Sequence, residues 1–200
     1  MTRKINWIGL AAGIITLIAL AISLYMPWWQ LTVGQSLIKI NASPVNTNFG
    51  LFGTQFTIPL IWALNLVTIL TFSASGIIML IYSLVPTKPY AKHLLGFSYK
   101  KPLYSVVSFV VVLAIILLIA GHFGVYLPLN GSATVTLPGS WTMGATVSAL
   151  VSGTFQLPFY LAVVATALCI TARLYHSHVS SALSESESTT TPPVTAATSV

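Results

Sequence analysis

The side chains able to carry out acid–base, nucleophilic or metal chemistry are few in this chain. It has no Asp; its two carboxylate side chains, Glu185 and Glu187, lie in a polar C-terminal segment, and its one cysteine is Cys169. A lone cysteine excludes an intrachain disulfide, and Cys169, His176 and His178 do not converge as metal ligands on a helix. No nucleophile–base pair, phosphate loop or paired carboxylates can be assembled. The sequence therefore predicts a protein without enzymatic activity, metal or cofactor.

His122 is the one ionisable residue expected well inside an apolar stretch. Ionisable groups within a membrane are candidates for function. A neutral imidazole hydrogen-bonded to a backbone or hydroxyl oxygen accounts for His122 without a function, and contact with a quinone is the alternative. A two-histidine haem site would need a second histidine in the apolar stretches, and a proton relay would need carboxylates there; the sequence has neither.

The composition excludes a soluble domain, because 56% of the residues are hydrophobic and 5% are charged, against about 25% charged in soluble proteins. Crossing a membrane takes about 20 apolar residues in a helix. Prolines at 59 and 158 suit helix starts, and those at 27 and 128 suit helix ends. The predicted transmembrane helices are 5–26, 58–85, 102–127 and 157–175. They make 1–176 a four-helix transmembrane domain, followed by a Ser/Thr-rich tail at 177–200 that is expected to be disordered and cytoplasmic.

Basic residues mark one side of the predicted helices as cytoplasmic. Only Lys39 falls on the other side; the side that is expected to be cytoplasmic holds Arg3, Lys4, Lys88, Lys92, Lys100, Lys101 and Arg173. The protein is then expected in the plasma membrane with both termini in the cytoplasm, and the loops at 27–57 and 128–156 lie on the extracytoplasmic side. Sequons at Asn41 and Asn130 fall in these loops as candidate glycosylation sites. The four lysines between 88 and 101 are expected to contact anionic lipid headgroups, at about 1 kcal/mol each, rather than nucleic acid.

Alternating residues in the two outer loops predict strands at 29–33, 36–40 and 133–137. Exposed sheet edges invite association, so the loops are expected to pair with each other, or with a partner. The predicted fold is an all-α membrane protein: a four-helix bundle with a small β-rich extracytoplasmic cap. Similar landmarks in the two halves, such as Gly53-Thr54 and Gly153-Thr154, indicate either a parallel internal repeat or chance recurrence.

Small residues spaced four apart allow close approach of helices in lipid. Gly9 and Gly13 form such a face on the first predicted helix. One interpretation is ordinary packing within the bundle. The other is contact with a second copy, in which case Gly9→Leu combined with Gly13→Leu would reduce association.

The first outer loop carries Trp28-Trp29 and, further on, Phe49-Gly50-Leu51-Phe52-Gly53. These residues resemble the W…GLW signature of the claudin-like tetraspan superfamily. The resemblance implies four helices, cytoplasmic termini and a strand-rich first outer loop, with Trp29 and Gly50-Leu51-Phe52 anchoring the outer sheet to the bundle. It also implies roles in cell–cell contact, lateral polymerisation, paracellular barriers or channels, or as accessory subunits. The chain lacks the family's paired loop cysteines and has Phe52 in place of the second tryptophan, so strand pairing alone would hold the loop.

The predicted function is that of a claudin-like structural or interaction protein that self-associates or joins a larger membrane assembly. The candidate interaction residues are Trp28, Trp29, Gly50, Leu51 and Phe52 in the cap and Gly9 and Gly13 in the helices. One alternative is an accessory subunit of a respiratory or other redox complex. Another is a small channel or transporter, for which the sequence offers weak polar groups: Asn65, Thr68, Thr71, Ser73, Ser75, Ser105, Ser108 and His122.

Overall fold

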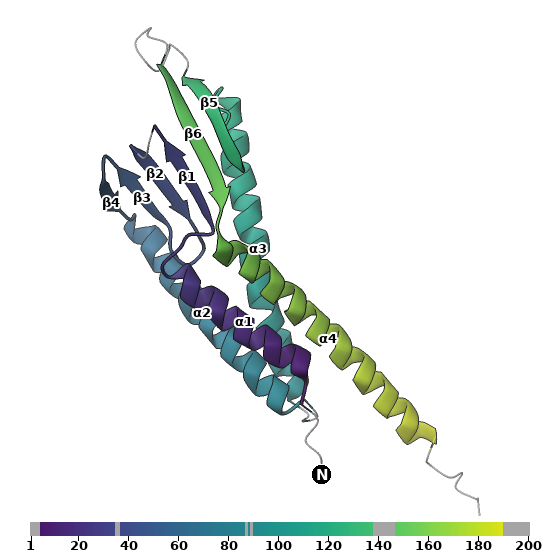
Figure 1. The fold of residues 1–200 in the computed structure, drawn as a ribbon. Helices are drawn as coiled ribbons and strands as arrows, with labels where there is room; N and C mark the ends of the chain where they lie inside the picture. The colour runs from purple at the N-terminus through teal and green to yellow at the C-terminus, as the bar shows by residue number, and fades with distance from the viewer. Residues whose placement is uncertain (1–4, 35–36, 87, 89, 138–146, 190–200) are drawn as a thin grey trace, which may run out of the picture.

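A computed structural model describes residues 5–34, 37–86, 88, 90–137 and 147–189, with side chains except at 137, 147 and 177–189. Its helices are α1 (Trp7–Ser23), α2 (Pro59–Leu84), α3 (Ala91–His122) and α4 (Leu157–Thr189). Its strands are β1 (Trp29–Val33), β2 (Ile38–Ala42), β3 (Asn48–Leu51), β4 (Thr54–Phe56), β5 (Gly131–Leu137) and β6 (Val147–Phe155). The strands form one sheet at one end of the helix bundle, and α1 begins and α4 ends at the other (Figure 1).

The four expected helices are present, but the first is shorter than predicted. Helices α2, α3 and the part of α4 up to His176 are long and apolar enough to cross a membrane. Helix α1 has 17 residues, which span about 25 Å at 1.5 Å per residue. It starts at Trp7 because Asn6 caps it, with Oδ1 accepting from Gly9 N at 3.1 Å. It ends at Ser23, ahead of Pro27, which cannot continue a helix.

Helix α3 begins at Ala91, so the expectation that it starts near Pro102 is wrong. Pro102 lies inside the helix and has no N–H to bond the carbonyl of Ser98. Ser75 of α2 donates its hydroxyl to that oxygen at 2.6 Å, and both serine side chains are buried. A neighbouring helix that satisfies the freed carbonyl lets a membrane helix continue through proline. The helix ends at His122, five residues earlier than the predicted 127.

Helix α4 is also longer than predicted, because it continues to Thr189 instead of ending at 175. After Pro158 the chain has no proline until Pro192 and no glycine in the helix, so nothing interrupts it. The segment expected to be disordered from 177 therefore begins as helix. Residues 190–200 lie outside the described part of the chain.

The two loops pair with each other, as one of the two alternatives predicted. The strand order is β4-β3-β2-β1-β6-β5, with β1 of the first loop antiparallel to β6 of the second. The predicted strand at 29–33 is confirmed, the one at 36–40 begins two residues later, and the one at 133–137 begins two earlier. Three strands, β3, β4 and β6, were missed, so the sheet is larger than the expected cap. A twofold repeat would make β1 and β5 equivalent, but β1 lies inside the sheet and β5 at its edge.

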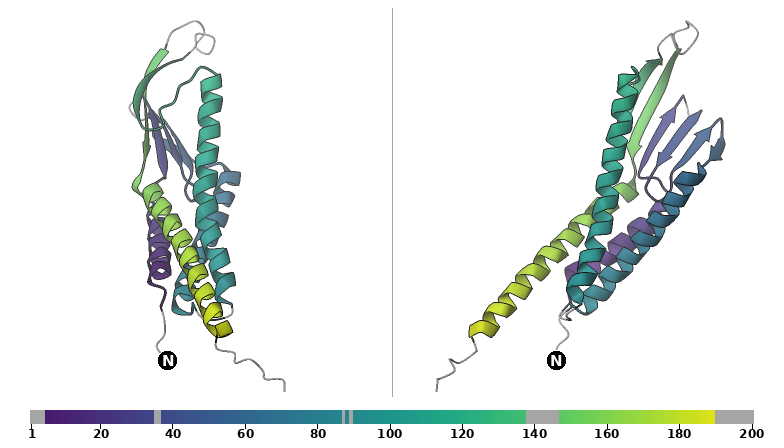
Figure 2. Two further views of the ribbon diagram at one scale, coloured as in Figure 1. Left: turned by 90° about the vertical axis from the view of Figure 1, so that its right-hand side faces the viewer. Right: turned by 180° about the vertical axis from the view of Figure 1, so that it is seen from behind.

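One face of the sheet, called here the inner face, is apolar. On it Leu31, Val135 and Val151 from β1, β5 and β6 are buried in one cluster with Phe109 and Leu113 of α3. Figure 2 shows α3 running along this face in its left-hand view. Helix α3 therefore does more than cross the bundle, because its C-terminal half covers the inner face beside β5 and β6.

The opposite face, called here the outer face, is polar. Strand pairing places Gln30, Asn41 and Asn48 in one row across β1, β2 and β3. Gln30 Nε2 donates to Asn41 Oδ1 at 3.1 Å, and Asn41 Nδ2 donates to Asn48 Oδ1 at 2.7 Å. Thr32 and Lys39 form the next cross-strand pair on this face. One apolar and one polar face are typical of an antiparallel sheet with water on one side.

The hydrogen bond at Pro102 predicts a specific energetic coupling. Ser75→Ala leaves the buried Ser98 carbonyl without a donor and should lower the free energy of unfolding by about 1–2 kcal/mol. In a Pro102→Ala background the helix regains its own N–H donor, so Ser75→Ala should lower the free energy of unfolding by much less. Unfolding of the four proteins in detergent, followed by circular dichroism, measures this cycle.

Ser83→Ala is the matched control, since the Ser83 hydroxyl donates at 2.7 Å to Met79 O within its own helix. If Ser75→Ala lowered the free energy of unfolding equally with and without Pro102, the Ser75 hydroxyl would not be what allows α3 to continue past the proline.

Candidate functional site

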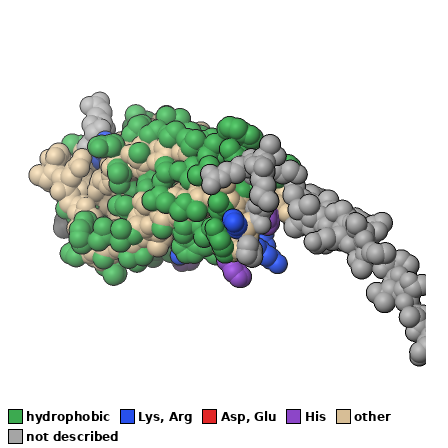
Figure 3. Space-filling model, turned by 90° about the horizontal axis from the view of Figure 1, so that it is seen from below, with side chains coloured by type: hydrophobic (Ala, Val, Ile, Leu, Met, Phe, Trp, Pro, Cys, Tyr) green, Lys and Arg blue, Asp and Glu red, His purple; other side chains and the backbone are tan. Residues whose placement is uncertain are grey.

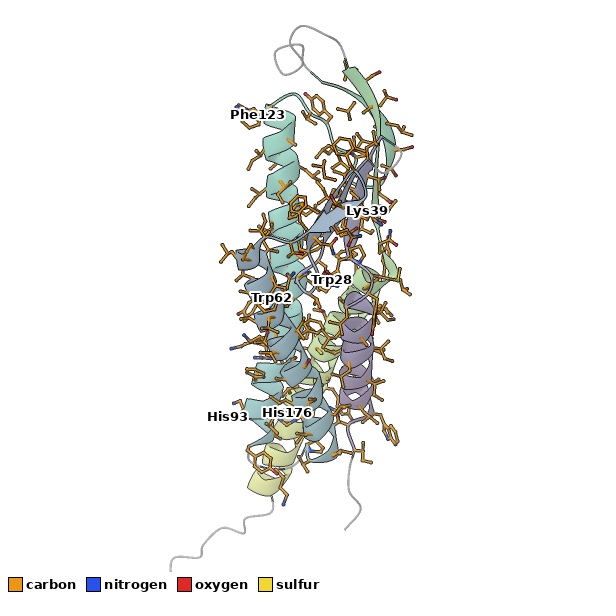
Figure 4. All side chains as sticks on the ribbon, turned by 90° about the vertical axis from the view of Figure 1, so that its left-hand side faces the viewer. Trp28, Lys39, Trp62, His93, Phe123 and His176 are labelled. Carbon is orange, nitrogen blue, oxygen red and sulfur yellow. The ribbon has the colours of Figure 1, made fainter. Side chains whose placement is uncertain are left out.

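The junction between sheet and bundle is built around Trp28, the residue before β1. Its side chain is fully buried and its Nε1 donates to Ser23 Oγ at the end of α1, at 2.8 Å. Its ring meets Phe109 of α3 edge-on at 5.2 Å and Phe159 of α4 at 6.1 Å. Figure 4 labels Trp28 between the strands and the helices. One indole therefore joins three helices to the first strand.

Trp29 holds the two loops together. It lies on the inner face of β1, is almost completely buried, and donates from Nε1 to Leu129 O of the second loop at 2.8 Å. In β6, Gly153 has no room for a side chain, because an added Cβ would collide with the Pro128 carbonyl and touch the Trp29 ring. The structure thus buries Trp28 where the sheet meets the helices and buries Trp29, the tryptophan that the resemblance names, where the two loops meet.

The other half of the expected anchor does not reach the bundle. Gly50 pairs with Lys39 in the sheet, and Leu51 and Phe52 lie at the turn from β3 to β4. Phe52 is 74% exposed and has a φ of 48°. The implied role of Leu51 and Phe52 as anchors is therefore corrected. The reason is the strand order, which puts β3 and β4 at the side of the sheet away from α3.

Gly9 and Gly13 are used inside the chain rather than between copies. Both are buried against α2. A Cβ at Gly9 would lie 2.8 Å from Ser83 Oγ, and one at Gly13 would lie 2.7 Å from Leu80 Cδ2 and 3.1 Å from Leu80 N. Gly76 of α2 makes the reciprocal approach to α1. Of the two interpretations of this face, the structure shows packing within the bundle, because α2 occupies it.

The remaining candidate polar residues do not form a site in the described part of the chain. His122 is exposed at the last position of α3, beside the ring of Phe123 at 5.6 Å. Asn41 is buried and both ends of its amide are hydrogen-bonded, which argues against its use as a glycan acceptor, while Asn130 is exposed. Cys169 is a buried free cysteine. Groups of three or more potential metal ligands are absent among the described residues.

The basic residues gather at the end of the bundle away from the sheet, as Figure 3 shows from below. Lys88, Lys92 and Lys100 are exposed there. The ammonium of Lys101 lies 5.9 Å above the ring of Phe97, one turn closer to the start of α3. Arg173 of α4 lies 4.2 Å above the ring of Tyr99 in α3. Lys39 lies on the sheet at the other end (Figure 4).

A small cavity lies where the end of α1, the β2–β3 loop and the start of α2 meet. Its volume is about 230 Å³, with Asn46, Thr47, Trp62 and Asn65 in its lining. With its amide oriented to suit both neighbours, Asn65 donates to Pro44 O at 3.3 Å and accepts from Thr47 N at 2.9 Å. Ligand pockets usually measure about 300–1,000 Å³. The amide of Asn65 is therefore accounted for by holding the loop on α2.

Hydroxyl groups in the helices bond to backbone oxygens. Thr68 donates to Leu64 O at 3.0 Å and Thr71 to Thr68 O at 3.2 Å, both within α2. Ser108 donates to Ser105 O at 3.3 Å within α3. Together with Ser75 and Asn65, these residues satisfy backbone and loop groups, which argues against a polar path across the bundle.

Several residues at the junction were missed from the sequence. Ser23, Phe109 and Phe159 surround Trp28 but lie on three different helices, and the sequence gives no local signal that they meet. The Ser98–Pro102 spacing did carry a signal, because a proline four residues after a carbonyl always deprives it of a helical donor. Such a spacing at buried positions of a helix indicates that a donor on a neighbouring helix bonds the freed carbonyl.

No protein-family model matches the chain, and a search of curated proteins found no significant match. The resemblance to claudin-like proteins thus remains confined to the quoted residues. The chain is a multi-helix apolar protein with a six-stranded antiparallel sheet.

Close packing of α1 on α2 predicts that Gly13→Ala is destabilising, since the new methyl group must displace the side chain of Leu80, whose backbone nitrogen also lies only 3.1 Å away. We expect a loss of about 1–3 kcal/mol in the free energy of unfolding, measured by thermal unfolding in detergent. Gly96→Ala is the matched control, because nothing lies within 4 Å of a Cβ there. Equal stability of the two variants would contradict the packing described for Gly13.

Burial of the Trp28 indole predicts that Trp28→Phe weakens the junction. The change removes the donor to Ser23 Oγ and leaves a gap between α3 and α4, so we expect a loss of about 2–3 kcal/mol in the same assay. Trp7→Phe is the control, because Trp7 is exposed and should respond by less than about 0.5 kcal/mol. A Trp28→Phe variant with the same free energy of unfolding as the wild type would overturn the role assigned to this residue.

Proposed function

We propose that this integral membrane protein is non-catalytic and acts as a structural or interaction protein, either by associating laterally with itself or as a subunit of a larger membrane assembly. The observation that carries the proposal is a division of polarity along the molecule. The helices expose apolar side chains such as Leu60, Leu70 and Ile77, one end is basic, and the other end carries a sheet with a polar outer face. Such a molecule presents surfaces for lipid and protein rather than a reaction site.

The orientation follows from the basic end. Lysines at 88, 92, 100 and 101 lie at that end together with Arg173, and the positive-inside rule assigns this end to the cytoplasm. The sheet then lies on the extracytoplasmic side of a plasma membrane. Lys101 supports this placement, because its side chain runs back towards the basic end over Phe97, as lysines do when they reach from apolar surroundings to an interface. The lysines are placed to contact anionic headgroups.

The alternative of a small channel or transporter receives less support. Of the polar groups proposed for a path, Asn65, Thr68, Thr71, Ser75 and Ser108 each bond to the backbone. The accessory-subunit alternative with a quinone near His122 is weakened, because this side chain is exposed at the helix end. The described side chains do not form a channel path or a quinone site. The division of polarity along the molecule therefore favours an interaction role over both alternatives.

Two copies with different affinity tags, expressed together and extracted gently, test the proposal. Lateral association predicts that one tag recovers the other, and the subunit alternative predicts that other membrane proteins are recovered in fixed ratio. Native mass spectrometry gives the stoichiometry. Recovery of a monomer alone would contradict the proposal.

The same purified protein in liposomes provides the second arm. We expect ion and proton flux no greater than in empty liposomes, and flux above that level would favour the channel alternative.

A further inference from the structure

Helices α3 and α4 meet at the basic end of the bundle, and each carries a cation beside the contact. Ala91 and Leu95 of α3 are buried in one cluster with Ala172 of α4. Lys92 follows Ala91 and Arg173 follows Ala172 in the sequence. Both of these side chains are exposed, so one cation from each helix lies at the surface next to the place where the helices touch.

Aromatic rings hold the basic side chains of α4 in place. The guanidinium of Arg173 lies 4.2 Å above the ring of Tyr99 in α3. His176, labelled at this end in Figure 4, meets the buried ring of Tyr82 edge-on at 5.6 Å and lies within electrostatic reach of Lys92. Stacking on a ring fixes the plane of a guanidinium but occupies none of its five N–H donors. Arg173 is therefore held in position with its donors still available.

These cations have no counterion among the side chains that the structure describes. Arg173 and Lys92 make no hydrogen bond or ion pair with any of them. The chain's only carboxylate side chains are those of Glu185 and Glu187, and the nearer one is about 18 Å beyond Arg173 along α4, at 1.5 Å per residue. Further lysines at 88, 100 and 101 add to the positive charge of this end (Figure 3). A bound anion would relieve the mutual repulsion of these charges.

The donor types favour a phosphate group as this anion. An arginine fork binds two oxygens of a phosphate at once, and a lysine adds a compact point charge. Arg173 and Lys92 come from different helices, so an anion between them needs oxygens that point in more than one direction. A tetrahedral phosphate has such oxygens, whereas the two oxygens of a carboxylate lie in one plane.

Apolar surface beside the donors favours a lipid as the carrier of the phosphate. Leu174 is 58% and Tyr175 52% exposed, and both come directly after Arg173 on α4. The apolar span of α4 ends at His176, and headgroups lie at the end of a span when the acyl chains run along it. A soluble phosphate compound would leave this apolar surface uncovered.

We propose that Arg173 and Lys92 form a binding site for the phosphate of one anionic lipid at the contact between α3 and α4. The inference rests on the orientation proposed above, which places this end at the cytoplasmic leaflet. It adds a defined headgroup site to the general attraction between a basic protein surface and an anionic membrane. The fork of Arg173 binds two phosphate oxygens, Lys92 supplies the second charge, and the acyl chains lie against Leu174 and Tyr175.

Lipid retention in native mass spectrometry tests the site. The protein is extracted gently from nanodiscs of phosphatidylcholine with a minor share of phosphatidylglycerol, and the phosphatidylglycerol retained per chain is counted. We expect Arg173→Gln and Lys92→Gln each to reduce retention about tenfold, because each removes charge-assisted hydrogen bonds. Lys100→Gln is the matched control, since it removes the same charge at the same end from outside the site; it should change retention by less than about twofold.

The outcomes separate this site from its alternatives. Loss confined to Arg173→Gln and Lys92→Gln supports the site, and the exposed position of Lys92 keeps the test valid if Arg173→Gln fails to fold. Equal losses for all three variants would overturn the site, because the charges would then act collectively on the membrane. Displacement of the lipid by glycerol phosphate at the same concentration would identify a soluble phosphate compound as the ligand and overturn the assignment to lipid.

The same spectra keep this inference separate from the proposed association, because retention is counted for monomers and oligomers individually. Oligomers without the retained lipid would overturn the site and leave lateral association standing. Monomers alone that retain the lipid would support the site and contradict the association.

Discussion

The apolar inner face of the sheet has to be removed from water, and the rest of the molecule follows from how that is done. The strands of two loops, far apart in sequence, meet at β1 and β6 and present Leu31, Val135 and Val151 on one side. Burying side chains of this size contributes about 1.5–3 kcal/mol each. Helix α3 provides the cover, which requires it to be longer than the bundle. That length depends on passing Pro102 without a break, and Ser75 of α2 makes this possible. A single hydroxyl in the bundle thus supports the packing of the sheet above it.

The bundle itself is held by close approach rather than by large side chains. Gly9 and Gly13 of α1 and Gly76 of α2 let these two helices meet at distances that leave no room for a methyl group. This is how helices associate where the surroundings are as apolar as the side chains. Since α2 occupies the small-residue face within the chain, the lateral association proposed above would use other surfaces.

The sequence predicted the elements whose signals are local and left out those that depend on tertiary contact. Four apolar stretches, the division of charge and strand β1 were predictable because composition and alternation carry them. The predicted start of α3 was wrong because proline was taken as a helix boundary. A donor on another helix bonds the carbonyl that the proline leaves free, so the helix continues. Strands β3 and β4 were missed since Gly50 and Gly53 interrupt the alternation. Trp28-Trp29 was recognised as a pair, but its partners Phe109 and Phe159 lie on other helices and had no signal in the sequence.

The central claim is that α3 continues past Pro102 and covers the inner face of the sheet with its C-terminal half. A cysteine pair, Leu113→Cys with Val151→Cys in a Cys169→Ala background, measures it through disulfide formation within one chain, because both side chains are buried in the same cluster. The account predicts a bond within the monomer, and much less product for Ile115→Cys with Val151→Cys, since Ile115 is 50% exposed. Equal yields for the two pairs would contradict the account.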